Sequence, residues 1–269
     1  MLTWPEEPEV TDWEPVDDAT LAGRLGALIP TSGAALVLID GRSGNGKSTL
    51  GDRICRLIGA GLIHTDDVAW HLHATDWADA LVGGVLEPWR RGDAVSFRPP
   101  GWVARDRPGS IELAPTRILV VEGVGAGRAE LARQADVVIW VQSDQAEARR
   151  RGVVRDVALG RPPTEAEAFW DEWASSEDPF LAADRPWTRA DFIVNGTPPR
   201  ADDRTWLAPG PIGTATGPLD PPNEPIGTSP VSTAVAIATH VPEVRDAPGV
   251  PSSTNVPIGS ARWPDEVPT

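Results

Sequence analysis

The chain has 269 residues, a formal net charge of −15 and a single cysteine, Cys55. This length suits one α/β domain of ordinary size with some chain left over. The acidity argues against nucleic acid as a partner, and one cysteine excludes an internal disulfide framework. We find no basic and apolar signal at the N-terminus and no apolar run of membrane-spanning length. We therefore expect a soluble, cytoplasmic protein without a membrane partner, and the sequence does not indicate its oligomeric state.

The first 33 residues read as an acidic arm followed by a short helix. The N-terminal arm, Met1–Val16, is broken by prolines and carries two isolated tryptophans, so we expect a loose segment laid on the domain through its indoles. Asp17 or Asp18 can cap a helix that runs to Ile29.

A phosphate-loop pattern, G-x-x-x-x-G-K-S, follows this helix. An apolar run over residues 34–40 predicts a buried parallel strand before it, and helix-spaced apolar residues over 48–58 predict a helix after it. Glycines let the backbone approach a polyphosphate, so that amide groups and the positive end of the helix dipole face the anion. The residues expected to bind the nucleotide are Gly41, Arg42, Ser43, Gly44, Asn45, Gly46, Lys47, Ser48 and Thr49.

Lys47 is the only lysine in the chain. A sequence that otherwise uses arginine has kept one flexible ammonium group where a phosphate loop needs it. We expect Lys47 to reach the β- and γ-phosphates of ATP and the Ser48 hydroxyl to join a Mg²⁺ shell. The alternative is a glycine-rich turn between strand and helix with an incidental lysine.

Two adjacent carboxylates, Asp66 and Asp67, follow the strand predicted over residues 62–65. Ligands of open parallel sheets lie beyond the carboxyl ends of the strands, so this pair is expected to face the nucleotide. Asp66 is a candidate base for a substrate hydroxyl, or a ligand to magnesium through water. A helix N-cap or an Asx turn explains these residues equally well, and the spacing does not decide between Asp66 and Asp67 as the base.

An insertion at 98–109 follows the helix predicted over residues 76–92. It concentrates three arginines and a tryptophan, which could grip an anionic or aromatic ligand, although a solvated hairpin explains them at least as well. Three nearby histidines, His64, His71 and His73, lack the cysteines or carboxylates that would complete a zinc site, so we interpret them as ordinary polar residues.

The strand predicted over residues 117–123 ends in Glu122 and a glycine. An apolar run that ends in a carboxylate downstream of a phosphate loop has the form of a Walker B strand, in which the carboxylate holds Mg²⁺ or its water. A turn carboxylate without a ligand is the alternative. Two further buried strands are expected over residues 136–141 and 190–194.

A dense arginine cluster lies on the helix predicted after Asp144. Guanidinium groups that close over the γ-phosphate would stabilise charge in phosphoryl transfer, which makes Arg151 and Arg155 candidates for that role. A solvated, charged helix is the alternative. Another helix is expected over residues 164–183, with its aromatic side chains mostly in the core.

Together, the phosphate loop, the Asp66-Asp67 pair, the strand end at Glu122 and the arginine segment 151–161 resemble the uridine kinase-like branch of the P-loop kinases. More closely, they resemble small actinobacterial proteins labelled uridine kinase or ATP-binding protein. The resemblance implies a P-loop NTPase three-layer α/β sandwich: a five-stranded parallel sheet in the order 2-3-1-4-5, flanking helices and an arginine-bearing lid. It also assigns the base role to Asp66. Uridine kinases usually carry aromatic residues, often tyrosine, just after the catalytic acid; here Val68-Ala69-Trp70 follows, and the chain has no tyrosine.

From residue 209 the composition shifts to Pro, Gly, Ser, Thr and Ala, which cannot bury enough apolar surface to offset the entropy of ordering. We therefore expect three parts: the arm and helix over 1–33, a P-loop kinase-like domain over 34–208 and a disordered tail over 209–269.

The expected activity is ATP- and Mg²⁺-dependent phosphoryl transfer to a hydroxyl of a small molecule, with a nucleoside such as uridine as the first candidate. A kinase of the same fold for a nucleotide, sugar or cofactor precursor is the nearest rival. From another class, the chain could be an ATP-binding regulator that uses its tail to bind a partner. A GTPase is disfavoured because the N-K-x-D guanine-reading motif needs a second lysine.

Overall fold

The computed structural model describes residues 1–72, 76–199 and 203–213, which belong to one compact unit, Met1–Gly213. Most of the predicted tail, residues 214–269, lies outside the described residues. His73, at the start of the segment 73–75, lies outside them as well. None of the described helices is both long enough and apolar enough to cross a membrane.

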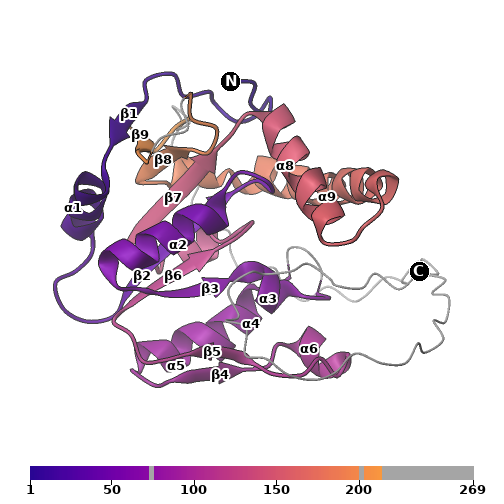
Figure 1. The fold of residues 1–269 in the computed structure, drawn as a ribbon. Coiled ribbons are helices and arrows are strands. Elements are labelled where there is room, and N and C mark those ends of the chain that lie inside the picture. Colours follow the sequence, from indigo (N-terminus) through magenta and orange to yellow (C-terminus); the bar gives the residue numbers. More distant parts are fainter. Residues whose placement is uncertain (73–75, 200–202, 214–269) are drawn as a thin grey trace, which may run out of the picture. The chain divides into compact units, whose positions relative to one another are not determined.

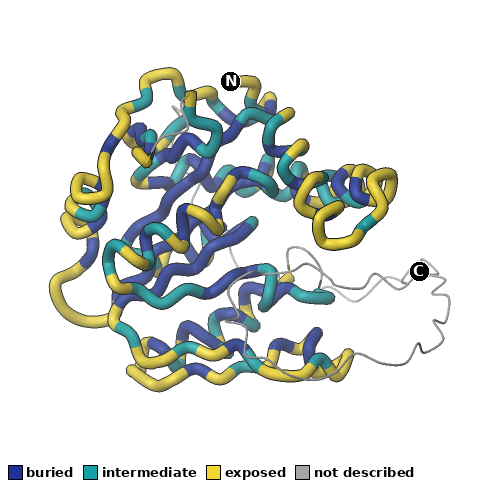
Figure 2. The backbone as a smooth tube through the Cα atoms, in the orientation of Figure 1, coloured by how far each residue is buried: buried dark blue, intermediate teal, exposed yellow. Residues whose placement is uncertain are grey.

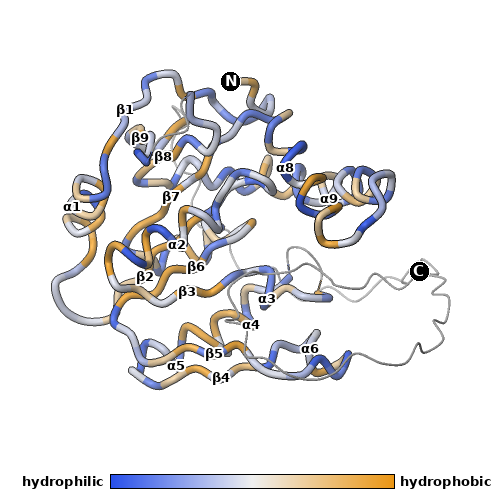
Figure 3. The backbone as a smooth tube through the Cα atoms, viewed as in Figure 1, coloured by the Kyte–Doolittle hydropathy of each residue, from blue (hydrophilic) through white to orange (hydrophobic). Residues whose placement is uncertain are grey.

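A seven-stranded sheet, ordered β1-β9-β8-β7-β2-β6-β3, runs through this unit (Figure 1). Its five parallel strands are β3 (Gly61–His64), β6 (Ile118–Glu122), β2 (Ala35–Gly41), β7 (Val137–Gln142) and β8 (Phe192–Asn195). They pair in that order, which is the predicted 2-3-1-4-5 arrangement. The central strands β2, β6 and β7 are buried along their whole length and mostly hydrophobic (Figures 2 and 3), as expected for parallel strands covered on both faces.

The prediction of five strands was wrong, because two antiparallel strands extend the sheet. β9 (Thr205–Pro209) pairs with β8, and β1 (Glu14–Val16) pairs with β9. Only Val16 is buried in β1, whose sequence is Glu-Pro-Val. Without an apolar run, such a short edge strand has no periodic signal in the sequence.

Two hydrophobic clusters lie on opposite faces of the sheet, because successive side chains of a strand point to opposite sides. Along β2, Val37 and Ile39 join the cluster that contains residues of α1 (Asp18–Leu28) and α2 (Lys47–Ile58), whereas Leu36 and Leu38 join the other cluster. Asp17 caps α1, with its Oδ1 accepting a hydrogen bond from the Thr20 amide at 2.8 Å. The result is a three-layer α/β arrangement.

The helix predicted over residues 76–92 is formed in three continuous parts with a π-helical turn in the middle. The remaining elements after β3 are α3 (Thr65–Ala69), α4 (Ala78–Leu81), η1 (Val82–Leu86), α5 (Glu87–Arg90), β4 (Val95–Phe97), α6 (Pro100–Ala104), β5 (Ile111–Leu113), α7 (Ala129–Ala132), α8 (Gln145–Ala158), α9 (Pro163–Asp184) and η2 (Pro186–Thr188). Four side chains spaced along this segment are buried in the core: Trp77, Leu81, Val85 and Trp89.

The N-terminal arm is packed on the domain instead of loose. Trp4 is 6% exposed and Glu7 is 3% exposed. The prediction of a loose segment was therefore wrong, because an acidic sequence does not reveal whether its carboxylates meet buried partners elsewhere in the chain.

Candidate active site

The phosphate loop connects β2 to α2, and its Gly44 lies against Ala148 in the first turn of α8. Gly46, at the N-cap of α2, has a left-handed backbone with φ of 90°. Gly44 also has positive φ, and a Cβ at this position would collide with the carbonyl oxygen of Ala148 in α8. The backbones of the loop and of α8 therefore approach more closely than any other residue type at position 44 would allow.

A cavity of about 310 Å³ lies beside the loop. It is lined by Ser43, Gly44, Gly46, Lys47, Ser48 and Thr49 from the loop region. Four more predicted site residues line the same cavity: Asp66 after β3, Glu122 at the end of β6, and Arg151 and Arg155 from α8. The structure thus brings together residues that the sequence places up to about a hundred positions apart.

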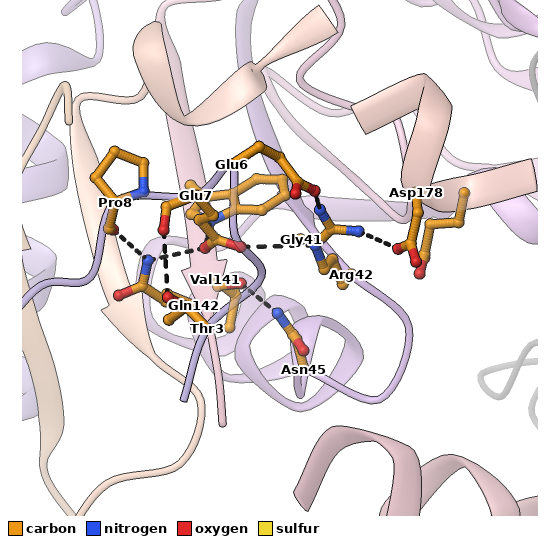
Figure 4. Close-up of polar contacts among 12 residues, drawn as sticks. Thr3, Glu6, Glu7, Pro8, Gly41, Arg42, Asn45, Val141, Gln142 and Asp178 are labelled. Carbon is orange, nitrogen blue, oxygen red and sulfur yellow. Dashed lines mark hydrogen bonds and ion pairs between the residues drawn. The ribbon is translucent and has the colours of Figure 1, made fainter. Parts of the chain in front are cut away.

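Three of the loop residues expected to bind the nucleotide do not line the cavity: Gly41, Arg42 and Asn45. The side chain of Arg42 is fully buried among carboxylates from other parts of the chain. The Asn45 amide donates a hydrogen bond to the carbonyl oxygen of Val141 at 2.7 Å (Figure 4). Both side chains therefore contact protein groups away from the cavity, whereas the motif alone had assigned them to the nucleotide.

Lys47 is largely buried at the start of α2. Its Nζ donates a hydrogen bond to the carbonyl oxygen of Arg42, near the start of the loop, at 3.0 Å. Its charge also lowers the pKa of Glu122, although less than a hydrogen bond from His64 does. The ammonium group is thus held at the cavity between the loop backbone and an acidic strand end.

Glu122 is hydrogen-bonded to His64, the last residue of the neighbouring strand β3. Burial opposes the charged form of Glu122, but the His64 hydrogen bond, Lys47 and the Ser48 hydroxyl outweigh it and lower the pKa of this carboxyl. Burial likewise opposes charge on His64, but Glu122 raises the pKa of the imidazole. The carboxylate is therefore ionised and oriented, and a neighbour that the sequence analysis treated as an ordinary polar residue orients it.

The adjacent acids of α3 occupy different surroundings. Asp66 lines the cavity, whereas Asp67 lies 3.8 Å from Arg107 and its carbonyl oxygen accepts a hydrogen bond from the Trp102 indole at 2.8 Å. Burial raises the pKa of Asp67. Of the two acids that the sequence left open, only Asp66 faces the cavity.

The insertion at 98–109 connects the antiparallel strands β4 and β5, and most of its residues are exposed, whereas Pro99, Gly101 and Trp102 are buried. Trp102 is 3% exposed, and the Arg107 guanidinium stacks on its ring at 3.8 Å. Arg98 donates to the carbonyl oxygen of Arg107 at 2.8 Å. None of these three residues lines the cavity beside the loop.

The arginine cluster of α8 divides into two groups. Arg149 pairs with Asp171, and Arg150 is 63% exposed and pairs with Glu147; neither residue lines the cavity. Arg151 lines the cavity and donates to the Gly196 carbonyl oxygen at 2.7 Å and to Glu147 at 2.8 Å. Arg155 lines the cavity as well and pairs with the neighbouring Asp156.

Asp40, the residue before the loop, was missed by the sequence analysis. Its carboxylate accepts hydrogen bonds from the amides of Gly41 (2.7 Å), Gly125 (2.9 Å) and Gly127 (2.8 Å). It is fully buried, and this burial raises its pKa to about 6. Asp40 therefore fixes the loop after β6 to the start of the phosphate loop. The sequence offered one signal for this role: Asp40 is a carboxylate at the end of an apolar strand, directly before the phosphate-loop motif.

The metal ligands proposed from the sequence, Ser48 and Glu122, supply the oxygen donors that Mg²⁺ prefers. Among the described residues, no group of three or more His, Cys, Asp or Glu side chains could hold a metal ion. Mg²⁺ is commonly bound by one or two protein oxygens together with substrate phosphates, which fits this donor set.

No protein-family model matches the chain, and no curated protein is a significant match. Among solved structures, a possible uridine kinase from Bacillus stearothermophilus is 18% identical with a TM-score of 0.44, over 65% of this chain and 96% of that one. A protein from Silicibacter described as a fructose transport system kinase is 20% identical with a TM-score of 0.42, and the match covers 63% of this chain and 92% of that one. Shikimate kinase from Bacteroides thetaiotaomicron is 17% identical with a TM-score of 0.31, over 60% and 86%.

Proposed function

We propose that the cavity is the active site of an ATP- and Mg²⁺-dependent phosphotransferase that acts on a hydroxyl of a small molecule. The observation that carries the proposal is the single cavity lined by Lys47, Asp66, Glu122, Arg151 and Arg155. A lysine in a phosphate loop, a strand-end carboxylate, a separate acid and arginines are the parts that phosphoryl transfer requires.

The phosphate loop and Lys47 would bind the triphosphate through the exposed N-terminus of α2 and one ammonium group. Ser48 and Glu122 would hold Mg²⁺, which when bound neutralises charge on the phosphates. The hydrogen bond from His64 keeps Glu122 ionised and restricts its orientation, so this side chain is prepared for a cation before one binds.

Asp66 would accept the proton of the acceptor hydroxyl, since it is the member of the acidic pair that faces the cavity. Arg151 and Arg155 would stabilise the charge that spreads over the transferring phosphoryl group. The contacts of Arg151 with Gly196 and Glu147 hold its guanidinium near the loop.

We propose a nucleoside such as uridine as the first acceptor to test, on the basis of the motif resemblance described above. Nucleotides, sugars and cofactor precursors carry equivalent hydroxyl groups and belong in the same panel. The replacement of the family's usual aromatic run by Val68-Ala69-Trp70, without tyrosine, affects the choice of acceptor more than the transfer chemistry, because Asp66 and the loop are retained.

Mass spectrometry after incubation with Mg²⁺-ATP and a panel of nucleosides, nucleoside monophosphates and small sugars tests the proposal. We expect one acceptor class to gain a phosphate, with no product from Lys47→Ala. Asp66→Asn should reduce turnover by about 10²- to 10⁴-fold, whereas the matched control Asp67→Asn should retain most of the activity. ATP binding without transfer to any acceptor would support the regulator instead.

A further inference from the structure

We propose that the N-terminal arm is a positioning element of the active site: Trp4, Glu6 and Glu7 hold the phosphate loop and the α8–α9 pair so that Arg151 and Arg155 face the loop. The role given to these two arginines rests on the proposed function. The contacts of the arm with the loop and the helices do not.

The first contact is between the arm and Arg42 of the phosphate loop (Figure 4). The Arg42 guanidinium pairs with Glu6 through Nη2, and its Nε lies 3.6 Å from Oε2 of Glu7. It also lies 4.4 Å from the centroid of the Trp4 ring. The Arg42 side chain has no exposed surface, so its charge depends on these partners for compensation.

The arm is itself fixed to the central sheet. Glu7 accepts hydrogen bonds from the Trp140 indole at 2.6 Å and from the Gln142 amide at 2.8 Å, both on β7. The Gln142 amide also donates to the carbonyl oxygen of Pro8 at 2.9 Å, and its oxygen accepts from the Val10 amide at 2.9 Å. The carboxylates that face Arg42 are therefore presented by a segment held on a buried strand.

The same guanidinium binds α9. Nη1 of Arg42 donates to Asp178 at 2.5 Å, and the preceding residue, Glu177, accepts hydrogen bonds from the amide and hydroxyl of Ser43. Arg42 thus joins three segments: the phosphate loop, the arm and α9. Of the three carboxylates around it, the arm supplies two.

The arm also contacts the first turn of α8. The Leu2 amide donates to the N-cap carboxylate of Asp144 at 2.9 Å, and the Gln145 amide donates to the Leu2 carbonyl oxygen at 2.8 Å. Trp4 forms a small hydrophobic cluster with Ala148 of α8 and Trp170 of α9. The arm therefore packs at the junction of these two helices.

The position of α8 determines where Arg151 and Arg155 lie, because both belong to this helix. Its Gly152 faces Trp170 so closely that a Cβ would collide with the indole ring. The α8–α9 pair thus behaves as one packed unit, held to the loop by Arg42 and Ser43 and to the arm by Trp4. Loss of the arm contacts should let this pair move away from the loop.

Hydrogen–deuterium exchange of the full chain without nucleotide tests whether the arm holds the phosphate loop and α8 in place. We expect Trp4→Ala and the double variant Glu6→Gln/Glu7→Gln to speed amide exchange in residues 41–46 and in the first turns of α8 at least 10-fold. Glu14→Gln is the matched control, since Glu14 lies in the same N-terminal segment but is exposed and pairs with Arg24, away from the loop contacts. Wild-type exchange rates in both variants would overturn the proposal.

Once an acceptor is known, steady-state kinetics tests whether the arm positions Arg151 and Arg155 for phosphoryl transfer. We expect the arm variants to lower kcat at least 10-fold with a KM for ATP within 3-fold of wild type. In an Arg151→Ala background, where only Arg155 is left to position, we expect them to lower kcat by a smaller factor. An unchanged kcat despite faster exchange would overturn the positioning role. Arg42→Lys, which keeps the charge, should recover part of the activity lost in Arg42→Ala, and no recovery would contradict the ion-pair contribution.

A milder variant and an independent readout distinguish a variant that does not fold from a proposal that is wrong. The milder variant Glu6→Gln replaces the less buried of the two arm acids, so it decides the exchange result if the double variant does not fold. A wild-type protein that transfers no phosphate would contradict the proposed function, while the exchange experiment would still decide whether the arm holds α8 and the loop.

Discussion

Glu177 accepts hydrogen bonds from both the main-chain amide (2.8 Å) and the hydroxyl (2.9 Å) of Ser43, a residue 134 positions earlier in the chain. Glu177 is 3% exposed, and the Trp173 indole donates to the same Ser43 hydroxyl at 2.7 Å. Helix α9 thus fixes the conformation of the phosphate loop.

Removal of the Glu177 acceptor should destabilise the protein more than neutralisation of its charge. In Glu177→Ala the Ser43 amide and hydroxyl lose their partner, which should cost about 1–3 kcal/mol of unfolding free energy. In Glu177→Gln an amide oxygen can still accept both hydrogen bonds, so the loss should be smaller. Urea denaturation of the two variants measures the difference, and equal losses would show that the charge, not the acceptor, matters.

The packing of α8 on α9 can be tested with a pair of glycine-to-alanine variants. Gly152→Ala would force the Trp170 ring to move, and such overpacking typically costs about 1–3 kcal/mol. Gly23→Ala in α1 meets no atom within 4 Å, so it should stabilise the protein by about 0.5–1 kcal/mol through helix propensity alone. Thermal unfolding should shift in opposite directions; stabilisation by both variants would contradict the close α8–α9 contact.

The buried Asp40 should give stability a pH dependence of unusual sign. Burial raises its pKa from 3.8 to about 6, so the folded protein holds a proton over a pH range in which the unfolded chain has lost it. Its contribution therefore falls as pH rises from about 4 to about 6, by at most about 3 kcal/mol, and is constant above that range.

The variant Asp40→Asn isolates this effect, because its side chain does not ionise. The unfolding free energy of the wild type minus that of Asp40→Asn, measured by urea denaturation, should decrease between pH 4 and pH 6. The variant differs from the wild type by a constant because its amide group meets the Gly127 amide, but only the slope bears on the pKa. A difference that is flat with pH would contradict the raised pKa.

Two neighbouring arginines of α8 should have unequal effects on phosphoryl transfer. Arg151 lines the cavity, whereas Arg150 is exposed and pairs with Glu147. By comparison with arginines that stabilise the transferring group in kinases and GTPases, Arg151→Ala should lower kcat by about 10³-fold or more if the proposed function holds. Arg150→Ala removes an exposed, solvent-screened ion pair and should leave kcat nearly unchanged. Equal losses would indicate a general effect of charge on the helix.

Cys55 should be unreactive in the folded protein. Burial and then the nearby charge of Asp52 raise its pKa to about 12, so little thiolate exists at neutral pH. We expect a disulfide reagent at pH 8 to react at least about 100-fold more slowly with the folded chain than with the urea-unfolded chain. Because the chain has one cysteine, the reaction reports this site alone, and fast modification in the folded state would contradict the raised pKa.

Local sequence patterns predicted much of the core. The apolar runs predicted the five parallel strands, Asp17 was one of two predicted caps of α1, and the motif resemblance implied the strand order that the sheet has. The sequence also selected Lys47, Asp66, Glu122, Arg151 and Arg155, which line one cavity. The strand and cap predictions succeed because strand burial and helix capping each depend on residues close together in the chain.

Contacts between distant residues were decided only by the tertiary structure. The motif assigned Arg42 to the nucleotide, but its guanidinium lies among carboxylates of the arm and α9. Strand register sets Glu122 beside His64, and packing turns Asp66, not Asp67, toward the cavity. The local sequence of an acidic arm cannot show that Glu7 bonds Trp140, because that partner lies 133 residues away and becomes a neighbour only when the sheet forms.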